Sequence, residues 1–559
     1  MLLPLSPTAG ADFMQDDTKY HKSGIFISQN RIDKGRFMVY NVSKTMANKI
    51  THKEDNMILK FNDYYDKVKA CFLGKNIGGT VGAPFEGVTA INNVDFYTHD
   101  ISTGALPNDD LDLQLVWLLA AEKFGKTVNS AILADFWAYK IVAHWAEYGK
   151  GKINLRSGLI PPISGAYDNY MKDSNGAWIR SEIWACLCPG RPDLAAKYAL
   201  EDASVDHADE GVYAEVFTAA LESAAFVEND YEKLINIALS YIPKDCAVEK
   251  AIRLVQKCKA EGKTWKEARK AVMTEVPGAF AHRVDENLPE EDRTPRGPQG
   301  FDAPSNLGIM MIGWYYGEGD FGKTLCTAVN CGEDTDCTAA TLGSIWGILH
   351  GTKGIPAKWL DPIGDQIKTL SLDRTHELYK ICGTVSELTE RVTNLMPAFM
   401  TECVNLHGES GVEITTSEGD ALYDVGYPFG GCCHRCFKDE LELKNGNTVT
   451  IKSPFYYAYL TYNKGIEISE GVETEIELSF RARYRQGWID AKLYAPEDWE
   501  ILPSRELSLP IDYGKDNYKK FTVRIIPHNL KKGRYEFPIE LILDEARLPK
   551  YLPVAFIVR

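Results

Sequence analysis

The stretch that decides the fold is Cys331-Gly-Glu-Asp-Thr-Asp-Cys-Thr338, which leads directly into the small-residue segment Thr338–Gly347. A second stretch of the same kind, Pro107-Asn-Asp-Asp-Leu-Asp112, leads into the apolar segment Leu111–Ala121. In both stretches, carboxylates stand at the start of a long apolar helix, where Asp and Asn are ordinary caps and the helix dipole favours negative charge. Small residues let helix backbones approach closely, so this texture predicts a compact helical bundle.

The helical pattern extends outward from these two stretches over most of the chain. Between residues 57 and 408 the apolar residues recur at spacings of three and four, and we therefore expect one large all-α domain there. The pattern is clearest in Ala131–Tyr148, Leu194–Leu200, Val212–Val227, Tyr231–Ile242 and Ala247–Lys259. Residues 283–305, rich in Pro, Arg, Asp and Glu, are expected to form a long loop, and long loops inside compact domains are often functional.

The pattern of apolar residues changes after the helical region. After an expected linker at residues 409–435, Glu440-Leu-Glu-Leu-Lys-Asn-Gly-Asn-Thr-Val-Thr-Ile451 predicts a strand, an Asn-Gly turn and a second strand. Strict alternation then places one set of apolar residues on one face: Ile476, Leu478, Phe480, Ala482 and Tyr484. We expect an immunoglobulin-like β-sandwich over residues 436–559. Residues 1–56 show no sustained period and predict a weakly structured extension, so the chain as a whole is multidomain, α plus β.

Composition and charge exclude several classes of protein. The 559 residues are 45% apolar and 25% charged, as in folded globular proteins. The charges sum to 62 − 78 = −16, the wrong sign for general affinity to nucleic acid. No stretch reaches the roughly 18 apolar residues of a membrane-spanning helix, and the opening Met1-Leu-Leu-Pro-Leu-Ser lacks the basic region of a secretory signal. The thirteen cysteines read as reduced thiols, so we expect a cytoplasmic protein without nucleic-acid or membrane partners.

The two acidic stretches have two interpretations. Each is explained as a helix cap if taken alone. Together they carry more carboxylates than caps can use, and like charges crowd at a cost unless a cation neutralises them. Ligands that are mostly anionic oxygens suit Mg²⁺, Mn²⁺ or Ca²⁺ rather than a structural zinc ion. The sequence therefore leaves a cap and a metal site as alternatives.

A third stretch, Gly74-Lys-Asn-Ile-Gly-Gly-Thr-Val-Gly-Ala-Pro-Phe-Glu86, is rich in glycine. It follows the amphipathic segment Asp63–Leu73, which predicts a helix, whereas a dinucleotide-binding fingerprint requires a strand at that place. We expect a glycine-permitted turn that carries Glu86 toward a cleft.

Several short motifs, in this order along the chain, carry a family resemblance: Gly78-Gly-Thr-Val-Gly-Ala-Pro-Phe-Glu86, Asn108-Asp-Asp110, Ser174-Asn-Gly-Ala-Trp-Ile-Arg180, His207 and Gly332-Glu-Asp-Thr-Asp336. Over residues 63–360 the chain resembles the ADP-ribosylglycohydrolase family. The resemblance implies an all-α fold with two Mg²⁺ ions, or Mn²⁺, between the acidic stretches. It also implies hydrolysis of an N- or O-glycosidic bond at the ribose of an ADP-ribosylated or related ribosyl compound.

The same resemblance implies roles for individual residues. The metal ligands would be Asn108, Asp109, Asp110, Asp334 and Asp336. The catalytic residues would be Glu86, Asp109 and Asp336. The substrate would contact Glu86, Ser174, Asn175, Gly176 and His207. Three positions depart from the family pattern: Asn108 and Cys337 each stand where Thr is usual, and Gly79 stands where Asp is common. A thiol is a poor ligand for Mg²⁺, whereas the carbonyl of Asn108 suits a hard cation.

Three alternatives remain open. Gly317-Glu-Gly-Asp-Phe-Gly-Lys-Thr324 fits the pattern of a phosphate-binding loop, in which Lys323 and Thr324 would contact a nucleotide. Cys432-Cys-His-Arg-Cys436 has the residue types of a zinc site but lacks a second ligand pair nearby. Finally, the chain is a non-catalytic binding protein if it keeps only the helical fold, with the β-sandwich as a module for a partner that the sequence does not identify.

Overall fold

A computed structural model describes most of the chain after its first 55 residues. The described residues are 56–559 except 277–282, 285–294, 297–300, 373–379, 410, 426, 430–432, 439–440, 442–445, 483–485, 512–518 and 545–548. The predicted N-terminal extension therefore lies outside the described residues, apart from Asn56, where strand β1 begins. Within the described part, no helix combines the length and the apolar character needed to cross a membrane.

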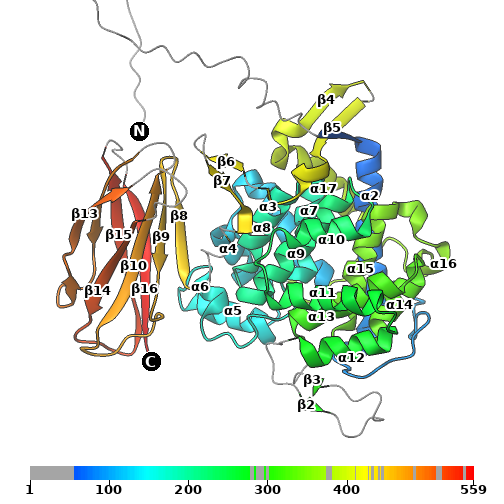
Figure 1. Ribbon diagram of the computed structural model, residues 1–559, viewed down its shortest axis with the longest axis horizontal. Coiled ribbons are helices and arrows are strands. Elements are labelled where there is room, and N and C mark those ends of the chain that lie inside the picture. Colours follow the sequence, from blue (N-terminus) through cyan, green and yellow to red (C-terminus); the bar gives the residue numbers. More distant parts are fainter. Residues whose placement is uncertain are drawn as a thin grey trace, which may run out of the picture. The chain divides into compact units, whose positions relative to one another are not determined.

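The helical region contains sixteen α-helices among the described residues (Figure 1). In chain order they are α2 (Phe61–Gly82), α3 (Asp109–Phe124), α4 (Ser130–Lys140), α5 (Ala146–Arg156), α6 (Ile163–Ala166), α7 (Glu182–Leu187), α8 (Pro192–Ala203), α9 (Asp209–Ala225), α10 (Tyr231–Leu239), α11 (Ala247–Ala260), α12 (Trp265–Glu275), α13 (Ala303–Tyr316), α14 (Phe321–Asn330), α15 (Thr335–His350), α16 (Ala357–Leu360) and α17 (Val385–Phe399). The predicted loop at 283–305 contributes the short paired strands β2 (Arg283–Val284) and β3 (Pro295–Arg296) and the first turn of α13.

Helices α2 and α15 pack against each other along their length, and glycines make this possible. A Cβ atom at Gly74 would lie 1.9 Å from the carbonyl oxygen of Gly343, and one at Gly78 would lie 2.1 Å from that of Ala339. The expectation of a glycine turn after Leu73 is therefore wrong, because the helix continues to Gly82 and its glycines serve close backbone contact. Burial against a partner helix outweighs the low helix propensity of glycine.

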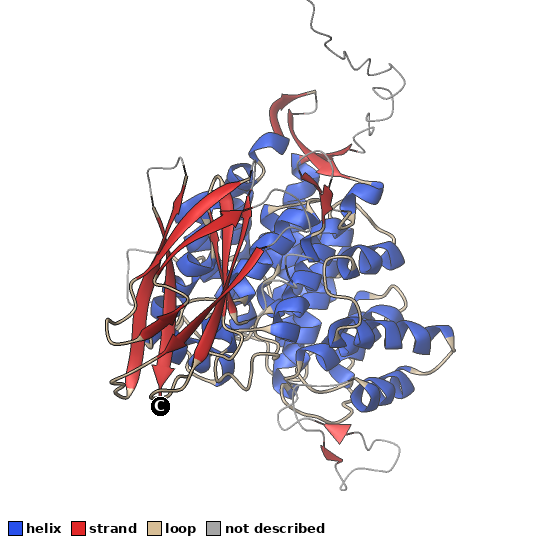
Figure 2. Ribbon diagram, turned by 60° about the vertical axis from the view of Figure 1, so that its left-hand side comes forward, coloured by secondary structure: helices blue, strands red, loops and turns tan. Residues whose placement is uncertain are grey.

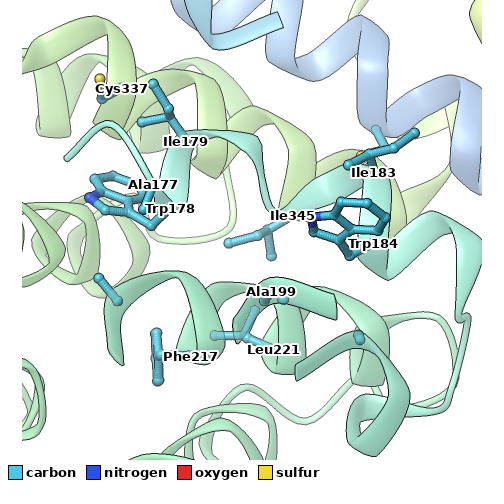
Figure 3. Packing of buried hydrophobic residues seen from close by; sticks show 14 of the residues in the cluster. Ala177, Trp178, Ile179, Ile183, Trp184, Ala199, Phe217, Leu221, Cys337 and Ile345 are labelled. Carbon is cyan, nitrogen blue, oxygen red and sulfur yellow. The ribbon is translucent and has the colours of Figure 1, made fainter. Parts of the chain in front are cut away.

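The core of the helical region is built from large apolar side chains of helices that are distant in sequence. Trp178 and Trp184 are fully buried and pack with Phe217 and Leu221 of α9 and with Ile345 of α15 (Figure 3). Burying one such side chain contributes roughly 1.5–3 kcal/mol. This rigid core fixes the position of the N-terminal end of α15, where the second acidic stretch lies.

The C-terminal region is a β-sandwich, so the predicted fold class, a large helical domain followed by a β-sandwich, is confirmed (Figure 2). One sheet has the strand order β12-β14-β10-β9-β8 and the other β13-β11-β15-β16. The bounds are β8 (Thr448–Lys452), β9 (Tyr456–Thr461), β10 (Thr474–Ala482), β11 (Gly487–Leu493), β12 (Glu500–Leu502), β13 (Glu506–Ile511), β14 (Lys519–Ile526), β15 (Gly533–Leu543) and β16 (Lys550–Val558). On β10 the residues at alternate positions, Ile476, Leu478, Phe480 and Ala482, are fully buried, and Tyr484 lies outside the described residues.

The segment between the two regions contains strands of its own. Strand β5 (Gly411–Ser417) pairs with β1 (Asn56–Lys60) on one side and with β4 (Val404–Gly408) on the other. Strand β6 (Tyr427–Phe429) pairs with β7 (Cys433–Arg435). The stretch predicted as a linker, 409–435, therefore holds paired strands in its described part.

Candidate active site

The two acidic stretches meet at one pocket, which has a cavity volume of about 70 Å³. It lies where the N-terminal ends of α3 and α15 converge, so two helix dipoles point positive ends toward it. Residues more than 200 positions apart thus share one site. Six carboxylates line the pocket: Glu86, Asp109, Asp110, Glu147, Asp334 and Asp336.

Asn108 shapes the start of α3. Its side-chain oxygen accepts a hydrogen bond of 2.7 Å from the backbone N–H of Asp110, which is a regular helix cap. Its amide nitrogen consequently faces the other way and lies 3.5 Å from Asp336 Oδ2. A Cβ atom at Gly79 would lie only 2.3 Å from this nitrogen. The carbonyl that we expected to face a cation therefore caps α3 in this structure.

At the start of α15, the carboxylate of Asp334 is held by Asn175. The Nε1–H of Trp178 donates to Asn175 Oδ1 at 2.8 Å, and since indole is only a donor, this fixes the orientation of the amide. The Asn175 amide nitrogen then donates to Asp334 Oδ2 at 2.8 Å. The backbone N–H of Asp334 donates to Asn306 Oδ1 at 3.1 Å. Asp334 is the N-cap residue of α15 but makes no capping bond with its side chain, which leaves its second oxygen to the pocket.

The donor set fits a divalent cation. Of the side-chain oxygens that belong to the residues lining the pocket, three are buried without a hydrogen-bond partner among the described residues: Asp110 Oδ2, Asp334 Oδ1 and Asp336 Oδ1. Ligand atoms lie within 4.8 Å of one another in two groups, one formed by Glu86, Asp334 and Asp336 and the other by Asp110, Asp336 and Cys337. Hard divalent cations take such oxygen ligands, whereas the thiol in the second group is a softer donor. A helix cap alone would leave these oxygens unsatisfied at a cost.

Among the described residues, the lysine beside the pocket does not neutralise it. Lys75 Nζ lies 3.8 Å from Asp110 Oδ2 but only 2.7 Å from Glu182 Oε1. Gln114 donates to the other Glu182 oxygen at 2.7 Å. Burial alone would lower the pKa of Lys75, but the charges of Glu182 and Asp110 outweigh it and raise the pKa. Lys75 is thus a permanent cation, shared between a structural carboxylate and the pocket.

The carboxyl groups of the pocket hold protons more tightly than exposed ones. The charge of Asp336, together with burial, raises the pKa of Glu86 to about 8. Burial, together with the charge of Asp109, raises the pKa of Asp336 to about 6. Burial and the charge of Asp336 also raise the pKa of Asp334. Without a cation, these groups cannot all be ionised at neutral pH.

Glu86 lies at the mouth of the pocket, in the exposed segment after the 3₁₀ turn Ala83–Phe85. Two backbone hydrogen bonds tie this segment to the second acidic stretch. The N–H of Gly87 donates to the carbonyl of Glu333, and the N–H of Glu333 donates to the carbonyl of Val88, both at 2.9 Å. Glu86 is therefore presented to the pocket by the same turn that carries Asp334.

Two pocket residues were missed in the sequence. The hydroxyl of Tyr148 donates to Asp109 Oδ2 at 2.8 Å, and Glu147 lines the opposite wall against Gly176. Both lie in the first turn of α5, where an acidic residue reads as ordinary helix capping. Nothing in their local sequence distinguishes them from structural residues.

Other predicted residues lie beside the pocket rather than on its wall. Ser174 and His207 are buried, 3.2 Å apart from Oγ to Nε2, and neither lines the cavity, whereas Asn175 and Gly176 do. Asp112, in the first acidic stretch, points away and accepts hydrogen bonds from the backbone N–H groups of Leu370 and Ser371. It serves as a structural acceptor.

The alternative nucleotide site does not have the required structure. Residues before the proposed phosphate loop form helix α13 instead of a strand. Asp320 caps helix α14 by accepting from the N–H of Lys323, and the Lys323 ammonium pairs with Glu318 at 2.5 Å. The segment is a helix–helix turn. Of the alternative zinc motif, Cys432 lies outside the described residues.

A family model provides the informative comparison with known proteins. A family model described as ADP-ribosylglycohydrolase matches residues 61–391, more than half of the chain. A search of curated proteins finds no match. A solved structure described as an "ADP-ribosylglycohydrolase-related protein complex" is 19% identical over 60% of this chain and 98% of its own, with a TM-score of 0.39. The family rests on the first of these matches: the chain belongs to the ADP-ribosylglycohydrolase family.

Proposed function

We propose that the chain is a metal-dependent hydrolase that cleaves a glycosidic bond at the ribose of an ADP-ribosylated or related ribosyl compound. The observation that carries this proposal is the set of buried carboxylate oxygens without partners, which converge from α3 and α15 on one pocket. The family supports a glycohydrolase, and the donor set supports a divalent cation.

Mg²⁺ or Mn²⁺ would be held by Asp109 and Asp110 from α3 and by Asp334 and Asp336 from α15. When bound, such cations would orient the ribose hydroxyls and add Lewis acidity at the reacting centre. The hydrogen bond from Tyr148 to Asp109 and that from Asn175 to Asp334 would hold two of these carboxylates in a fixed orientation. Preorganised ligands lower the cost of binding.

Glu86 is the residue best placed for proton transfer. Its pKa of about 8 without a cation shows how strongly it responds to the neighbouring charge of Asp336. A cation in the pocket would neutralise that charge and return Glu86 toward its ionised form, in which it can take a proton from attacking water. The carboxylates around it would stabilise the positive charge that develops on the ribose ring in a glycosidic cleavage.

The size of the cavity bears on where the substrate would bind. The cavity of about 70 Å³ has room for ions and their water ligands beside the carboxylates. The ribose would therefore sit at the mouth, with its hydroxyls toward the carboxylates. Asn175 and Gly176, on the wall, would contact it there, while the group that leaves would point outward past Glu86.

The test compares substitutions of two buried aspartates, one from each acidic stretch. Asp336→Asn should abolish release of free ribose or ADP-ribose from p-nitrophenyl riboside and from an ADP-ribosylated peptide, assayed with Mg²⁺ or Mn²⁺. Asp112→Asn, the matched control, should keep activity but lower the free energy of unfolding by about 1–3 kcal/mol, because three hydrogen bonds to one oxygen are weakened. Turnover by the Asp336 variant equal to that of the unsubstituted chain would place the chemistry elsewhere in the chain. Absence of turnover by both proteins would favour a non-catalytic binding protein.

A further inference from the structure

Glu147 is a carboxylate of the pocket that the proposed chemistry does not use. It lies in the first turn of α5 with only 7% of its surface exposed. A Cβ atom at Gly176 would lie 2.2 Å from Glu147 Oε1, so the carboxylate rests directly on the backbone of residue 176. Glycine is the residue that leaves room for it. The carboxylate thus faces the part of the wall where the substrate is proposed to lie.

A line of buried polar groups holds Glu147 from behind. The Ser174 hydroxyl and the charge of His207 both favour the ionised form of Glu147, and Ser174 Oγ lies 3.2 Å from His207 Nε2. His207 Nδ1 lies 2.9 Å from Asp206 Oδ1, and Asp206 pairs with Arg180 at 2.7 Å. All four supporting residues are buried. A side chain held in this way keeps one orientation.

The wall of the pocket carries no compensating charge. Among the described residues that line it, six are carboxylates and none is Lys, Arg or His. Lys75, behind Asp110, is already paired with Glu182 at 2.7 Å. Sites that bind phosphate often supply Arg or Lys at the contact, and the described lining of this pocket has neither. At Gly176 this chain supplies a carboxylate.

We propose that Glu147 determines the substrate class: it selects ribosyl compounds that present a hydroxyl or amide donor at Gly176 and disfavours those that present a phosphate there. This inference rests on the proposed function and narrows its substrate to ribosyl compounds without a phosphate at that contact. A hydroxyl would donate a charge-assisted hydrogen bond to the Glu147 carboxylate, about twice as strong as a neutral one.

The ionised form of Glu147 opposes a phosphate. Burial raises the pKa of Glu147, and the neighbouring His207 works against that rise. An ionised Glu147 would repel the phosphate directly, and a phosphate that forced it to take up a proton would have to supply the free energy of that uptake. The ionised carboxylate therefore acts against an anion at Gly176.

The test measures the affinity of the full chain for two probes that differ by one phosphate, ribose and ribose 5-phosphate, by calorimetry at one fixed Mg²⁺ concentration. The unsubstituted chain should bind ribose at least about tenfold more tightly than ribose 5-phosphate, since charges a few ångströms apart in a partly buried site interact strongly. Glu147→Gln should shift the ratio of the two affinities about tenfold toward ribose 5-phosphate. Glu147→Asp, which keeps the charge, should retain the original preference.

The matched control is Asp135→Asn, which removes one negative charge from an exposed position of α4 and should leave the ratio unchanged. A ratio unaffected by Glu147→Gln, or tighter binding of ribose 5-phosphate by the unsubstituted chain, overturns the role of Glu147. Tighter binding of ribose 5-phosphate can be observed with the unsubstituted chain alone. The proposal can therefore be overturned even if the Glu147 variants fail to fold. Binding of neither probe would overturn the proposed function together with it.

Discussion

Two groups of buried carboxylates lie side by side in the helical region, and they are neutralised in different ways. In the first, Arg180 pairs with Asp202 at 2.8 Å and with Asp206 at 2.7 Å, all three fully buried. There the charges of Arg180 and His207 outweigh burial and lower the pKa of Asp206, whereas burial outweighs Arg180 at Asp202 and raises its pKa. In the pocket, burial raises the pKa of Asp336, and no cation of the described chain contacts it.

In the Arg180 group the fold supplies a counter-charge to two buried acids. Among the described residues no cation lines the pocket, which agrees with the proposed metal site. Buried charge without a partner is costly, and such cost is retained mainly at functional sites. Four experiments test this difference between the two groups of carboxylates.

The largest effect is expected from breaking the neutralised group. Arg180→Met leaves Asp202 and Asp206 buried without the guanidinium that pairs with both, and should lower the free energy of unfolding by about 3–5 kcal/mol, measured by urea denaturation. Arg191→Met is the control, because it removes an exposed pair with Asp193 and should cost less than about 1 kcal/mol. Equal losses in the two variants would mean that the Arg180 group contributes no more than a surface pair.

The pH dependence of stability should have the opposite sign in the pocket, because ionisation of its carboxyl groups should destabilise the folded protein. The pKa of Asp336 is raised to about 6 in the folded metal-free protein, so its ionisation favours unfolding. Stability should therefore be highest near pH 4 and fall as the pH rises to about 6, by roughly 3 kcal/mol for a shift of about two units. Glu86 extends the fall toward pH 8. Urea denaturation of Asp336→Asn should give a flatter pH profile than the unsubstituted chain, and parallel profiles would contradict the assignment.

Binding of a divalent cation should remove the destabilisation that the ionised carboxylates of the pocket cause. Mg²⁺ or Mn²⁺ at about one hundred times its dissociation constant should stabilise the folded chain by about 2.7 kcal/mol, seen as a rise in Tm in thermal melts. Asp334→Asn should abolish the rise, whereas Asp112→Asn should keep it, since Asp112 points away from the pocket. Adding ATP to Mg²⁺ should produce no further rise.

The smallest effect is expected from a substitution of Cys337, whose thiol is a softer donor than the carboxylates. Cys337→Thr replaces a thiol 3.6 Å from Asp110 Oδ1 by a hydroxyl, which is a harder donor. Affinity for Mg²⁺ should rise a few-fold, up to about tenfold, or about 1.4 kcal/mol, in a calorimetric titration. Cys403→Ser, outside the pocket, should leave it unchanged. A weaker affinity in Cys337→Thr would show that the thiol itself serves as a ligand for the bound ion.

The sequence predicts the two acidic stretches well because their signal is local. Charge density at the start of an apolar helix is visible in a few residues, as in Asn108–Asp112. That the two stretches meet is not local, and it was inferred from the order of motifs. Asp112 shows the limit: the sequence places it beside Asp110, but the turn of the helix directs it to the backbone of residues 370–371.

Long-range packing explains what the sequence did not reveal. The glycines at 74 and 78 were read as a turn because glycine is a poor helix former, while their partner, α15, lies more than 250 residues away. Glu147 was missed for a related reason. An acid in the first turn of a helix is common, and only the position of Gly176 shows that its carboxylate reaches the pocket.

The contact between Gly79 and Asn108 links two departures from the family pattern into one change. The amide nitrogen of Asn108 occupies the space that a side chain at position 79 would need, 2.3 Å from where its Cβ would be. A side chain at position 79 would therefore force the Asn108 amide, the far end of a flexible side chain, to move. The orientation of that amide, which caps α3 with its oxygen and lies 3.5 Å from Asp336 Oδ2 with its nitrogen, thus depends on glycine at position 79.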